Sequence, residues 1–255
     1  MITYLFFTGG YDSTYRLCEL AIVNKVKVQP IYISDMFIDN EKNKKTRRKN
    51  HVYEKKSQDK IIDKIKDKFP NTKKLIEPTI IVKSIDYDKE TKEAMATMKK
   101  NKYVRRPKCQ YGAMAQYCKN ENKKVELCAE IGGHFEKKLG KYVTKEGDNY
   151  VFDVDKNKDL KVFENFYLPL IKMTKHDMLQ EAKTQDFDSI LNNTWSCWYP
   201  KNGKHCGKCI MCKERIVPYK EHFTMIKTKK NEMIYLFCMI LLLLILGTAK
   251  HITLS

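Results

Sequence analysis

The chain has 255 residues, with 49 Lys and Arg against 31 Asp and Glu, which gives a formal net charge of +18 at pH 7. Hydrophobic residues make up 42% and aromatic residues 11%, too many for a disordered chain, and 10 Gly and 7 Pro are too few for a collagen-like or low-complexity chain. This length suits one α/β domain or two small ones, with a core that can stand alone.

The positive charge alone would suit a nucleic-acid-binding protein, because Lys and Arg displace the counterions of phosphates. Most of the cations are lysines, however, which bind phosphate less specifically than arginines, and they are interleaved with Glu, Asp and Asn. Such an excess of Lys, Ile and Asn is typical of an AT-rich genome, so nucleic-acid binding stays an alternative. The arginines are Arg16, Arg47, Arg48, Arg105, Arg106 and Arg215.

Nine cysteines occur in a chain whose Met1 leads directly into a strand-like run, with no pattern of a signal peptide. This argues against a disulfide framework and predicts a reducing, cytoplasmic location with one metal site. Single cysteines such as Cys118 and Cys128 lie in apolar-periodic stretches and are most simply core residues.

The first expected elements are a buried strand at 2–7, a glycine turn and a helix at 12–23. A second strand is expected at 26–34, where Pro30 suits a strand start or a bulge. The charge-dense stretch 39–60 follows. Its first part is expected to be an exposed loop, before a helical period resumes at 61.

Further along, strands continue to alternate with helices, which implies a parallel sheet covered by helices on both faces. The predicted class is therefore α/β with a Rossmann-like sheet. The remaining elements are expected as a strand at 79–82, helices at 89–101 and 109–117, a strand at 125–131, a hairpin centred on Gly147-Asp148, and a helix opened by a capping box at Thr174-Lys175-His176-Asp177.

The segment T-G-G-Y-D-S-T lies where the first strand ends and the first helix begins. Two glycines let backbone N–H groups form an anion nest, and the hydroxyls of Ser13 and Thr14 could donate to phosphate oxygens. Asp12 would repel a phosphate unless a cation intervened, so it suggests a bridging Mg²⁺. The expected nucleotide-binding residues are Thr8, Gly9, Gly10, Tyr11, Asp12, Ser13 and Thr14, with Asp12 and Ser13 as candidate catalytic residues.

The alternative is a plain strand-to-helix turn with a glycine pair. The segment is neither a Walker loop, since no Gly-Lys-Ser/Thr follows, nor the dinucleotide G-x-G-x-x-G pattern. It resembles the S-G-G-x-D-S signature of the PP-loop ATP pyrophosphatases, with Thr8 in place of the first Ser. This resemblance implies cleavage of ATP between its α and β phosphates, which leaves an adenylated substrate and pyrophosphate.

Four cysteines lie close together near the end of the chain. Four thiolates close a tetrahedral Zn²⁺ site and leave no position for water, which predicts a structural zinc site. An iron–sulfur cluster and four unrelated core thiols are the alternatives. His205 is expected to be a solvent-facing neighbour rather than a ligand. The expected ligands are Cys197, Cys206, Cys209 and Cys212.

The second half of the chain carries the segments Y-L-P-L-I-K-M-T-K at 167–175, T-W-S-C at 194–197 and H-C-G-K-C-I-M-C-K-E-R at 205–215. Their order and spacing resemble 7-cyano-7-deazaguanine synthase, a PP-loop family of queuosine biosynthesis. Together with the N-terminal loop, the resemblance covers about residues 2–216. Its two ends are specific and its middle is weak.

The resemblance implies a Rossmann-like fold of the adenine nucleotide alpha hydrolase type, a homodimer, a structural Zn²⁺, and ATP with Mg²⁺. It also implies a reaction in which the carboxylate of 7-carboxy-7-deazaguanine is adenylated, ammonia displaces AMP to give an amide, and a second activation dehydrates the amide to the nitrile. The implied partners are therefore a small-molecule carboxylate and ammonia.

The middle of the chain departs from the family pattern. The family's Tyr-Gly-Gln motif is replaced by 35–39 and a Lys-rich insertion, and His51 only approximates the family's His. The G-Y-P-D-C-R segment of the deazaguanine pocket is missing after Gly132-Gly133-His134. Another carboxylate or a macromolecular target is therefore an alternative. Arg105 and Arg106 could bind an anion or be surface charge, and Trp195 and Trp198 could stack on a base or pack beside the cysteines.

The chain is expected to divide into a catalytic domain at 1–222, with its zinc-binding region at 194–215, and a basic linker with an apolar tail at 223–255. Residues 233–249 are uncharged. As a helix they would span about 25 Å, slightly less than a hydrocarbon core. Preceding lysines suit the positive-inside rule, so we expect a cytoplasmic enzyme with a membrane-anchoring tail, the alternative being a buried or dimer-interface helix.

Overall fold

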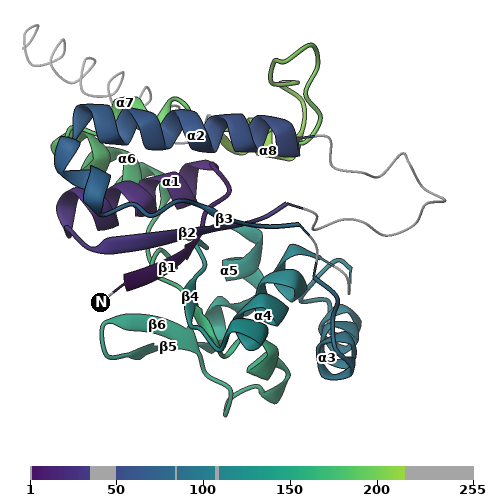
Figure 1. Ribbon diagram of the computed structural model, residues 1–255. Coiled ribbons are helices and arrows are strands. Elements are labelled where there is room, and N and C mark those ends of the chain that lie inside the picture. Colours follow the sequence, from purple (N-terminus) through teal and green to yellow (C-terminus); the bar gives the residue numbers. More distant parts are fainter. Residues whose placement is uncertain (1, 35–49, 84, 107–108, 216–255) are drawn as a thin grey trace, which may run out of the picture. The chain divides into compact units, whose positions relative to one another are not determined.

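The computed structural model describes residues 2–34, 50–83, 85–106 and 109–215 (Figure 1). The chain forms two units, Met1–Arg215 and Ile216–Ser255, and all of the described residues belong to the first. The apolar tail and most of the Lys-rich insertion, 39–49, lie outside the described residues.

A five-stranded sheet forms the centre of the first unit, and all four of its strand pairings are parallel. The strand order is β3-β2-β1-β4-β7, so the chain builds outward from β1 in one direction and then returns to build from β1 in the other. This is the predicted Rossmann-like α/β fold. The strands are β1 (Ile2–Phe6), β2 (Lys27–Ile33), β3 (Ile80–Val82), β4 (Val125–Glu126) and β7 (Phe166–Tyr167).

Helices cover both faces of the sheet, as predicted (Figure 1). One face carries α1 (Tyr11–Cys18), which continues as a π-helical stretch (Glu19–Val23), with α2 (His51–Lys68), α6 (Lys175–Thr184) and α7 (Asp188–Leu191). The other carries α3 (Lys89–Lys100), α4 (Gln110–Glu121) and α5 (His134–Leu139). The remaining elements are the hairpin β5 (Val143–Glu146) and β6 (Asn149–Phe152), 3₁₀ turns at Pro70–Lys74, Gly140–Tyr142 and Lys158–Phe163, and α8 (Ile210–Arg215).

The alternation of side chains along β1 accounts for the two cores. Leu5 and Phe7 pack into the core on the side of α1 and α2, whereas Phe6 packs into the core on the side of α3 and α4. In a strand, successive side chains point to opposite faces, so a continuous apolar run is what a strand covered on both sides requires.

Helix α2 and strand β4 differ in extent from the prediction, and α5, α7, α8 and β7 were not predicted. Helix α2 begins at His51, well before the apolar period resumes, because its first turns bury polar side chains: Glu54 accepts hydrogen bonds from Tyr32 (2.6 Å) and Asn50 (2.6 Å). Strand β4 is two residues long rather than seven, since the backbone leaves the sheet after Glu126 to form the site described below. The hairpin at Gly147-Asp148 and the capping box at Thr174–Asp177 are confirmed.

Within the described ranges, no helix is both long and apolar enough to span a bilayer. The predicted membrane anchor at 233–249 lies outside those ranges and stays a prediction.

Candidate active site

The loop after β1 lies where the sheet changes its direction of construction. Strand β1 pairs with β2 on one side and with β4 on the other, so the crevice at the carboxyl ends of β1 and β4 is the topological switch point. In open parallel sheets ligands bind at this crevice. Two segments therefore meet there: the glycine loop after β1 and the turn at Ala129–Glu130 after β4.

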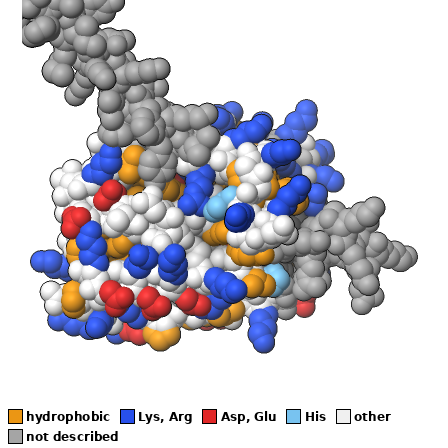
Figure 2. Space-filling model, turned by 90° about the horizontal axis from the view of Figure 1, so that it is seen from above, with side chains coloured by type: hydrophobic (Ala, Val, Ile, Leu, Met, Phe, Trp, Pro, Cys, Tyr) orange, Lys and Arg blue, Asp and Glu red, His pale blue; other side chains and the backbone are white. Residues whose placement is uncertain are grey.

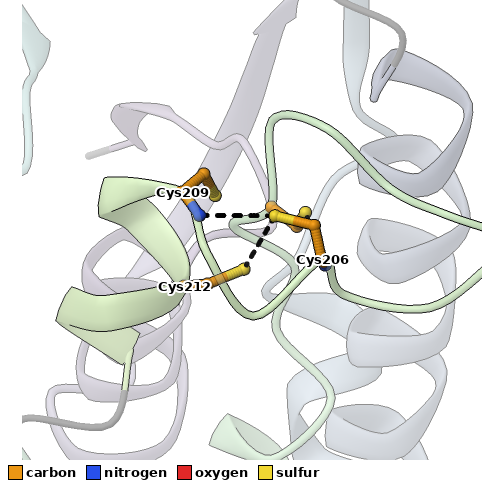
Figure 3. A group of neighbouring side chains, drawn as sticks. Cys206, Cys209 and Cys212 are labelled. Carbon is orange, nitrogen blue, oxygen red and sulfur yellow. Dashed lines mark hydrogen bonds between the residues drawn. The ribbon is translucent and has the colours of Figure 1, made fainter.

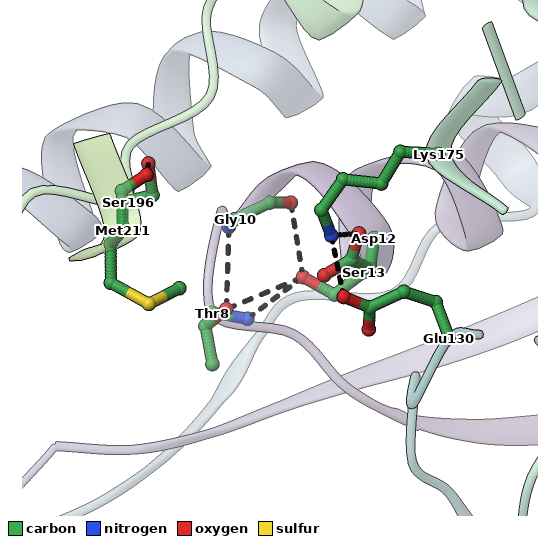
Figure 4. A network of polar contacts seen from close by, with 8 residues as sticks. All are labelled: Thr8, Gly10, Asp12, Ser13, Glu130, Lys175, Ser196 and Met211. Carbon is green, nitrogen blue, oxygen red and sulfur yellow. Dashed lines mark hydrogen bonds and ion pairs between the residues drawn. The ribbon is translucent and has the colours of Figure 1, made fainter. Parts of the chain in front are cut away.

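The glycine loop is closed by its own hydroxyl groups (Figure 4). The backbone N–H of Thr8 donates to Oγ of Ser13 (3.3 Å), and that hydroxyl donates to the carbonyl of Gly10 (3.3 Å). The N–H of Gly10 reaches Oγ1 of Thr8 at 3.3 Å. These are long hydrogen bonds, so an incoming phosphate oxygen could replace them at small cost.

Gly9 has a φ of +72°, which favours glycine. A Cβ at this position would lie 3.1 Å from Cγ of Gln58 and 3.2 Å from the carbonyl oxygen of Glu54, so helix α2 closes one side of the loop. The amide of Gln58 is fully buried there and has no hydrogen-bond partner among the described residues.

A lysine joins the two segments that meet in the crevice (Figure 4). Nζ of Lys175, in the first turn of α6, donates to Oδ1 of Asp12 (2.5 Å) and to Oε1 of Glu130 (2.7 Å). Asp12 follows β1, Glu130 follows β4 and Lys175 follows β7. One ammonium group is thus shared by two carboxylates at the switch point.

The electrostatics of this group follow from its partial burial. Burial alone would lower the pKa of Lys175, but the charges of Asp12 and Glu130 raise it well above its usual range, so the ammonium stays charged. Burial raises the pKa of Glu130 and the charge of Asp12 raises it further, while Lys175 opposes both effects. The site therefore holds one ammonium and two carboxylates whose pairing an entering charged ligand can change.

A half-buried arginine fixes α1 against β4 beside the crevice. Arg16 binds Glu126 in a bidentate manner, with both N–O distances at 2.7 Å, and also binds Glu19 (2.6 Å). Bidentate arginine–carboxylate pairs impose geometry as well as attraction. This contact orients the helix whose first turn carries Asp12 and Ser13.

The T-W-S-C segment lies against the glycine loop. The backbone N–H of Trp195 donates to the carbonyl of Gly9 (2.8 Å). Ser57 of α2 donates to the carbonyl of Asn193 (2.7 Å) and lies 3.4 Å from the same Gly9 carbonyl. The two ends of the sequence that carry the motifs are thus brought together in one site.

The four predicted metal ligands form one cluster, whose Sγ atoms all lie within 4.8 Å of one another. Four sulfurs around a tetrahedral Zn²⁺ lie about 3.8 Å apart, given Zn–S distances of about 2.3 Å, so a small contraction would fit the ion. Sγ of Cys206 and of Cys212 are 3.9 Å apart (Figure 3). The cysteine cluster, namely Cys197, Cys206, Cys209 and Cys212, could therefore hold zinc.

Backbone N–H groups already point at the sulfurs, as a thiolate cluster requires. The N–H of Cys206 donates to Sγ of Cys197 (3.2 Å), and the N–H of Cys209 donates to Sγ of Cys206 (3.4 Å). The N–H groups of Lys208 and Cys209 lower the pKa of Cys206 to about 6, whereas burial raises the pKa of Cys212 to about 12.

His205 differs from its prediction in one respect. It is absent from the group of ligand atoms, as expected, but it is half-buried rather than solvent-facing. Its ring stacks on Trp195, with ring centroids 4.2 Å apart, and its Nε2 lies 2.5 Å from Arg215. Trp195 also stacks on Tyr53 of α2 (4.7 Å), so its aromatic contacts are with protein rings.

Thr14 and Tyr11, which were also predicted to bind the nucleotide, are buried residues of α1. Thr14 is fully buried in α1, and its hydroxyl has no partner among the described residues, whereas Tyr11 is buried below Nζ of Lys175, which lies 6.0 Å from its ring centre. Arg105, Arg106 and His51 are exposed.

A comparison with protein-family models matches residues 3–223 to the model described as "Queuosine biosynthesis protein QueC". This is the 7-cyano-7-deazaguanine synthase family. The chain belongs to it. Neither the curated proteins nor the solved structures contain a match to the chain. Membership in the QueC family implies use of ATP by a PP-loop enzyme, which accords with the glycine loop at the switch point.

Sequence reasoning missed Glu130 and the contact made by Lys175. The P-L-I-K-M-T-K segment already contains Lys175, but nothing local indicates that its side chain reaches back 163 positions to Asp12. Glu130 lies near the end of the strand predicted at 125–131, and a carboxylate at a strand's carboxyl end in an α/β sheet was the available signal.

Proposed function

We propose that this QueC-family chain uses ATP to adenylate the carboxylate of 7-carboxy-7-deazaguanine and converts it with ammonia, through the amide, to the nitrile. The observation that carries the proposal is the Lys175 ammonium shared by Asp12 and Glu130 beside the glycine loop. Cleavage between the α and β phosphates needs cations and N–H groups around the departing pyrophosphate, and this crevice supplies both.

The chain's own residues have separable roles in this proposal. The N–H groups of the glycine loop and the hydroxyl of Ser13 bind the pyrophosphate oxygens. Asp12 and Glu130 would hold Mg²⁺, since two carboxylates at one crevice offer the oxygen ligands that this ion prefers. When bound, Mg²⁺ would neutralise charge on the phosphates. Lys175, released from the carboxylates, would then be free to contact the leaving pyrophosphate.

The reaction balances as three displacements and a final elimination. A substrate carboxylate oxygen attacks the α-phosphorus of ATP, the bond to the β-phosphate oxygen breaks, and pyrophosphate leaves. Ammonia then attacks the acyl carbon, loses a proton and displaces AMP. The amide oxygen attacks a second ATP, pyrophosphate leaves again, and loss of two N–H protons with AMP gives the nitrile. Each activation converts an oxygen that is a poor leaving group into part of an AMP leaving group.

The cysteine cluster has a structural role in this proposal. Four thiolates leave no open coordination position for a substrate or water, so Zn²⁺ held there would fix the turn between Cys197 and α8 and take no part in the chemistry. A homodimer and a cytoplasmic location are proposed from family membership alone.

The test is product analysis with 7-carboxy-7-deazaguanine, ATP and ammonia. We expect AMP and pyrophosphate in equal amounts, and Asp12→Asn should abolish both while leaving the thermal unfolding transition near that of the wild-type chain. Release of ADP instead of AMP would contradict the proposal.

A different carboxylate or a macromolecular target is the second candidate. The family's pocket segment is missing after Gly132-Gly133-His134, and the structure places an exposed Ile131 and an exposed His134 there. A mass-spectrometric screen of carboxylates would separate the two candidates: AMP release with another acid but not with the deazaguanine would favour the second.

A further inference from the structure

Groups outside the glycine loop hold the carbonyl of the peptide unit between Gly9 and Gly10, whereas its N–H contacts, among the described residues, only Thr8 of the same loop. The carbonyl oxygen of Gly9 accepts the N–H of Trp195 at 2.8 Å and lies 3.4 Å from the Ser57 hydroxyl. A peptide unit is planar and trans, so its C=O and N–H point in opposite directions. Whatever fixes the Gly9 carbonyl therefore also aims the Gly10 N–H, one of the groups proposed to meet a phosphate.

Trp195 is in turn held by residues next to the cysteine cluster. Its ring stacks on His205, at 4.2 Å and 26°, and on Tyr53, at 4.7 Å and 13°. We call Tyr53, Trp195 and His205 the aromatic stack. His205 directly precedes Cys206, and the indole N–H of Trp195 donates to the carbonyl of Cys197 (3.1 Å). Both neighbours belong to the cysteine cluster.

Arg215, the last residue of α8, holds the segment that leads to Trp195. It donates to the carbonyls of Thr194 (2.7 Å) and Asn192 (3.2 Å), on the segment that leads to Trp195. Ser196 lies 3.5 Å from the carbonyl of Met211, also in α8 (Figure 4). The segment 192–197 is thus held between the glycine loop and the helix that carries Cys212.

We propose that the aromatic stack makes the cysteine cluster a positioning element of the glycine loop, so that a metal ion at the four thiolates tightens nucleotide binding. The inference rests on the proposed function, since it takes the loop to be the ATP site. The metal fixes the loop 197–206, this loop fixes His205, and His205 fixes Trp195, whose N–H orients the Gly9 carbonyl.

Such a coupling is reciprocal. If the metal tightens ATP binding by some factor, ATP must tighten metal binding by the same factor. ATP is therefore expected to slow the transfer of zinc to a chelator, although the nucleotide does not touch the cysteines.

The first test is the dissociation constant of ATP in the full-length, zinc-loaded protein, measured by calorimetry for His205→Ala and Tyr53→Ala. Losing one stacked ring should weaken ATP binding by about threefold to tenfold. His205→Phe, which keeps an aromatic ring at this position, should retain most of the wild-type affinity for ATP. Tyr199→Ala is the matched control, because Tyr199 lies in the same loop but is 67% exposed.

Zinc content per chain is measured for every variant. Tyr53 lies on α2 and is not part of the loop 197–206, so Tyr53→Ala tests whether the aromatic stack positions the glycine loop even if His205→Ala loses zinc. Wild-type ATP affinity in Tyr53→Ala with zinc still bound, or a rate of zinc transfer that ATP does not change, would overturn the inference alone. Absence of ATP binding by the wild-type chain would overturn the proposed function as well.

Discussion

Lys175 is the residue on which the charge balance of the crevice depends. Its ammonium lies 2.5 Å from Asp12 and 2.7 Å from Glu130. In Lys175→Ala, two carboxylates would face each other without a cation, and the pyrophosphate would lose a contact. We expect pyrophosphate release to fall by about 100-fold, the usual effect of removing one group that stabilises transition-state charge.

The control for that experiment is Lys172→Ala, which removes an exposed lysine three positions earlier on the same segment. It should release pyrophosphate at the wild-type rate. Equal losses in both variants would mean that general positive charge, rather than the shared ammonium, supports the reaction.

Gly9 offers a second prediction, with a matched control in the same chain. Gly9 and Gly147 both have positive φ, at +72° and +58°, but a Cβ at Gly147 would meet nothing within 4 Å. Gly147→Ala should therefore lower the free energy of unfolding by about 1 kcal/mol, which is the cost of holding a non-glycine residue at positive φ. Gly9→Ala should lower the free energy of unfolding, measured in urea, by more than this. It should also abolish ATP binding, because Gln58 and Glu54 crowd the added methyl group.

The motif residues could be predicted from the sequence, but the residues that they contact in the fold could not. The glycine loop and the four cysteines are local patterns with fixed spacing. The shared ammonium depends on contacts between Lys175 and residues 163 and 45 positions away, which only the assembled sheet creates. The stacking of His205 on Trp195 was missed for the same reason, since a ring contact leaves no periodic signal.

Among the elements, α6 sets the position of Lys175. Its capping box is complete: the Thr174 hydroxyl accepts from the N–H of Asp177 (3.1 Å), and the Asp177 carboxylate accepts from the N–H of Thr174 (2.9 Å). The N–H and the hydroxyl of Thr174 both donate to the Asp177 carboxylate, at 2.9 and 2.7 Å, and lower its pKa below the ordinary value of 3.8. The helix that carries the shared ammonium therefore begins at a defined residue.

Asp177→Ala should lower stability by about 1 kcal/mol, as loss of a cap does. A carboxyl group with a lowered folded-state pKa stabilises the fold above its unfolded pKa, and this contribution is lost as the pH falls through the folded-state value. Wild-type and variant stabilities should therefore converge below about pH 3.8, measured by thermal unfolding. Gln180→Ala, exposed on the same helix, should show no such convergence.

Helices and strands with an apolar period were predicted well, and those defined by buried polar contacts were not. The strand at 2–7 and the helix at 89–101 agree with β1 and α3 to within a residue or two. The first turns of α2 bury Glu54, Ser57 and Gln58, so hydrophobicity gave no signal there. Strand β7 is only two residues long, too short for any alternation to show.

The chain has a formal net charge of +18, and on the face seen in Figure 2 the described Lys and Arg side chains are spread out rather than gathered. A row of Asp and Glu side chains lies among them. Several lysines are paired, for example Lys68 with Asp186 (2.7 Å) and Lys119 with Asp88 (2.7 Å). This arrangement favours an enzyme with a Lys-rich composition over a nucleic-acid-binding relative.

The family-matched part of the chain and the tail that follows it can be tested separately. The family match ends at 223, and the described unit ends at Arg215. A chain truncated after His222 should keep ATP-dependent pyrophosphate release. If the tail anchors the protein, the same truncation should move it from the membrane fraction to the supernatant on centrifugation, and an unchanged distribution would reject the anchor.

Asp12, Glu130 and Lys175 follow three different strands, and this has a consequence for synthesis of the chain. The glycine loop leaves the ribosome early, yet its cation arrives only after the chain has reached β7, and the segment that holds the Gly9 carbonyl arrives later still. A nascent chain that stops before Lys175 carries the loop and two unbalanced carboxylates. If the loop binds ATP as proposed, nucleotide capture would require the nearly finished chain.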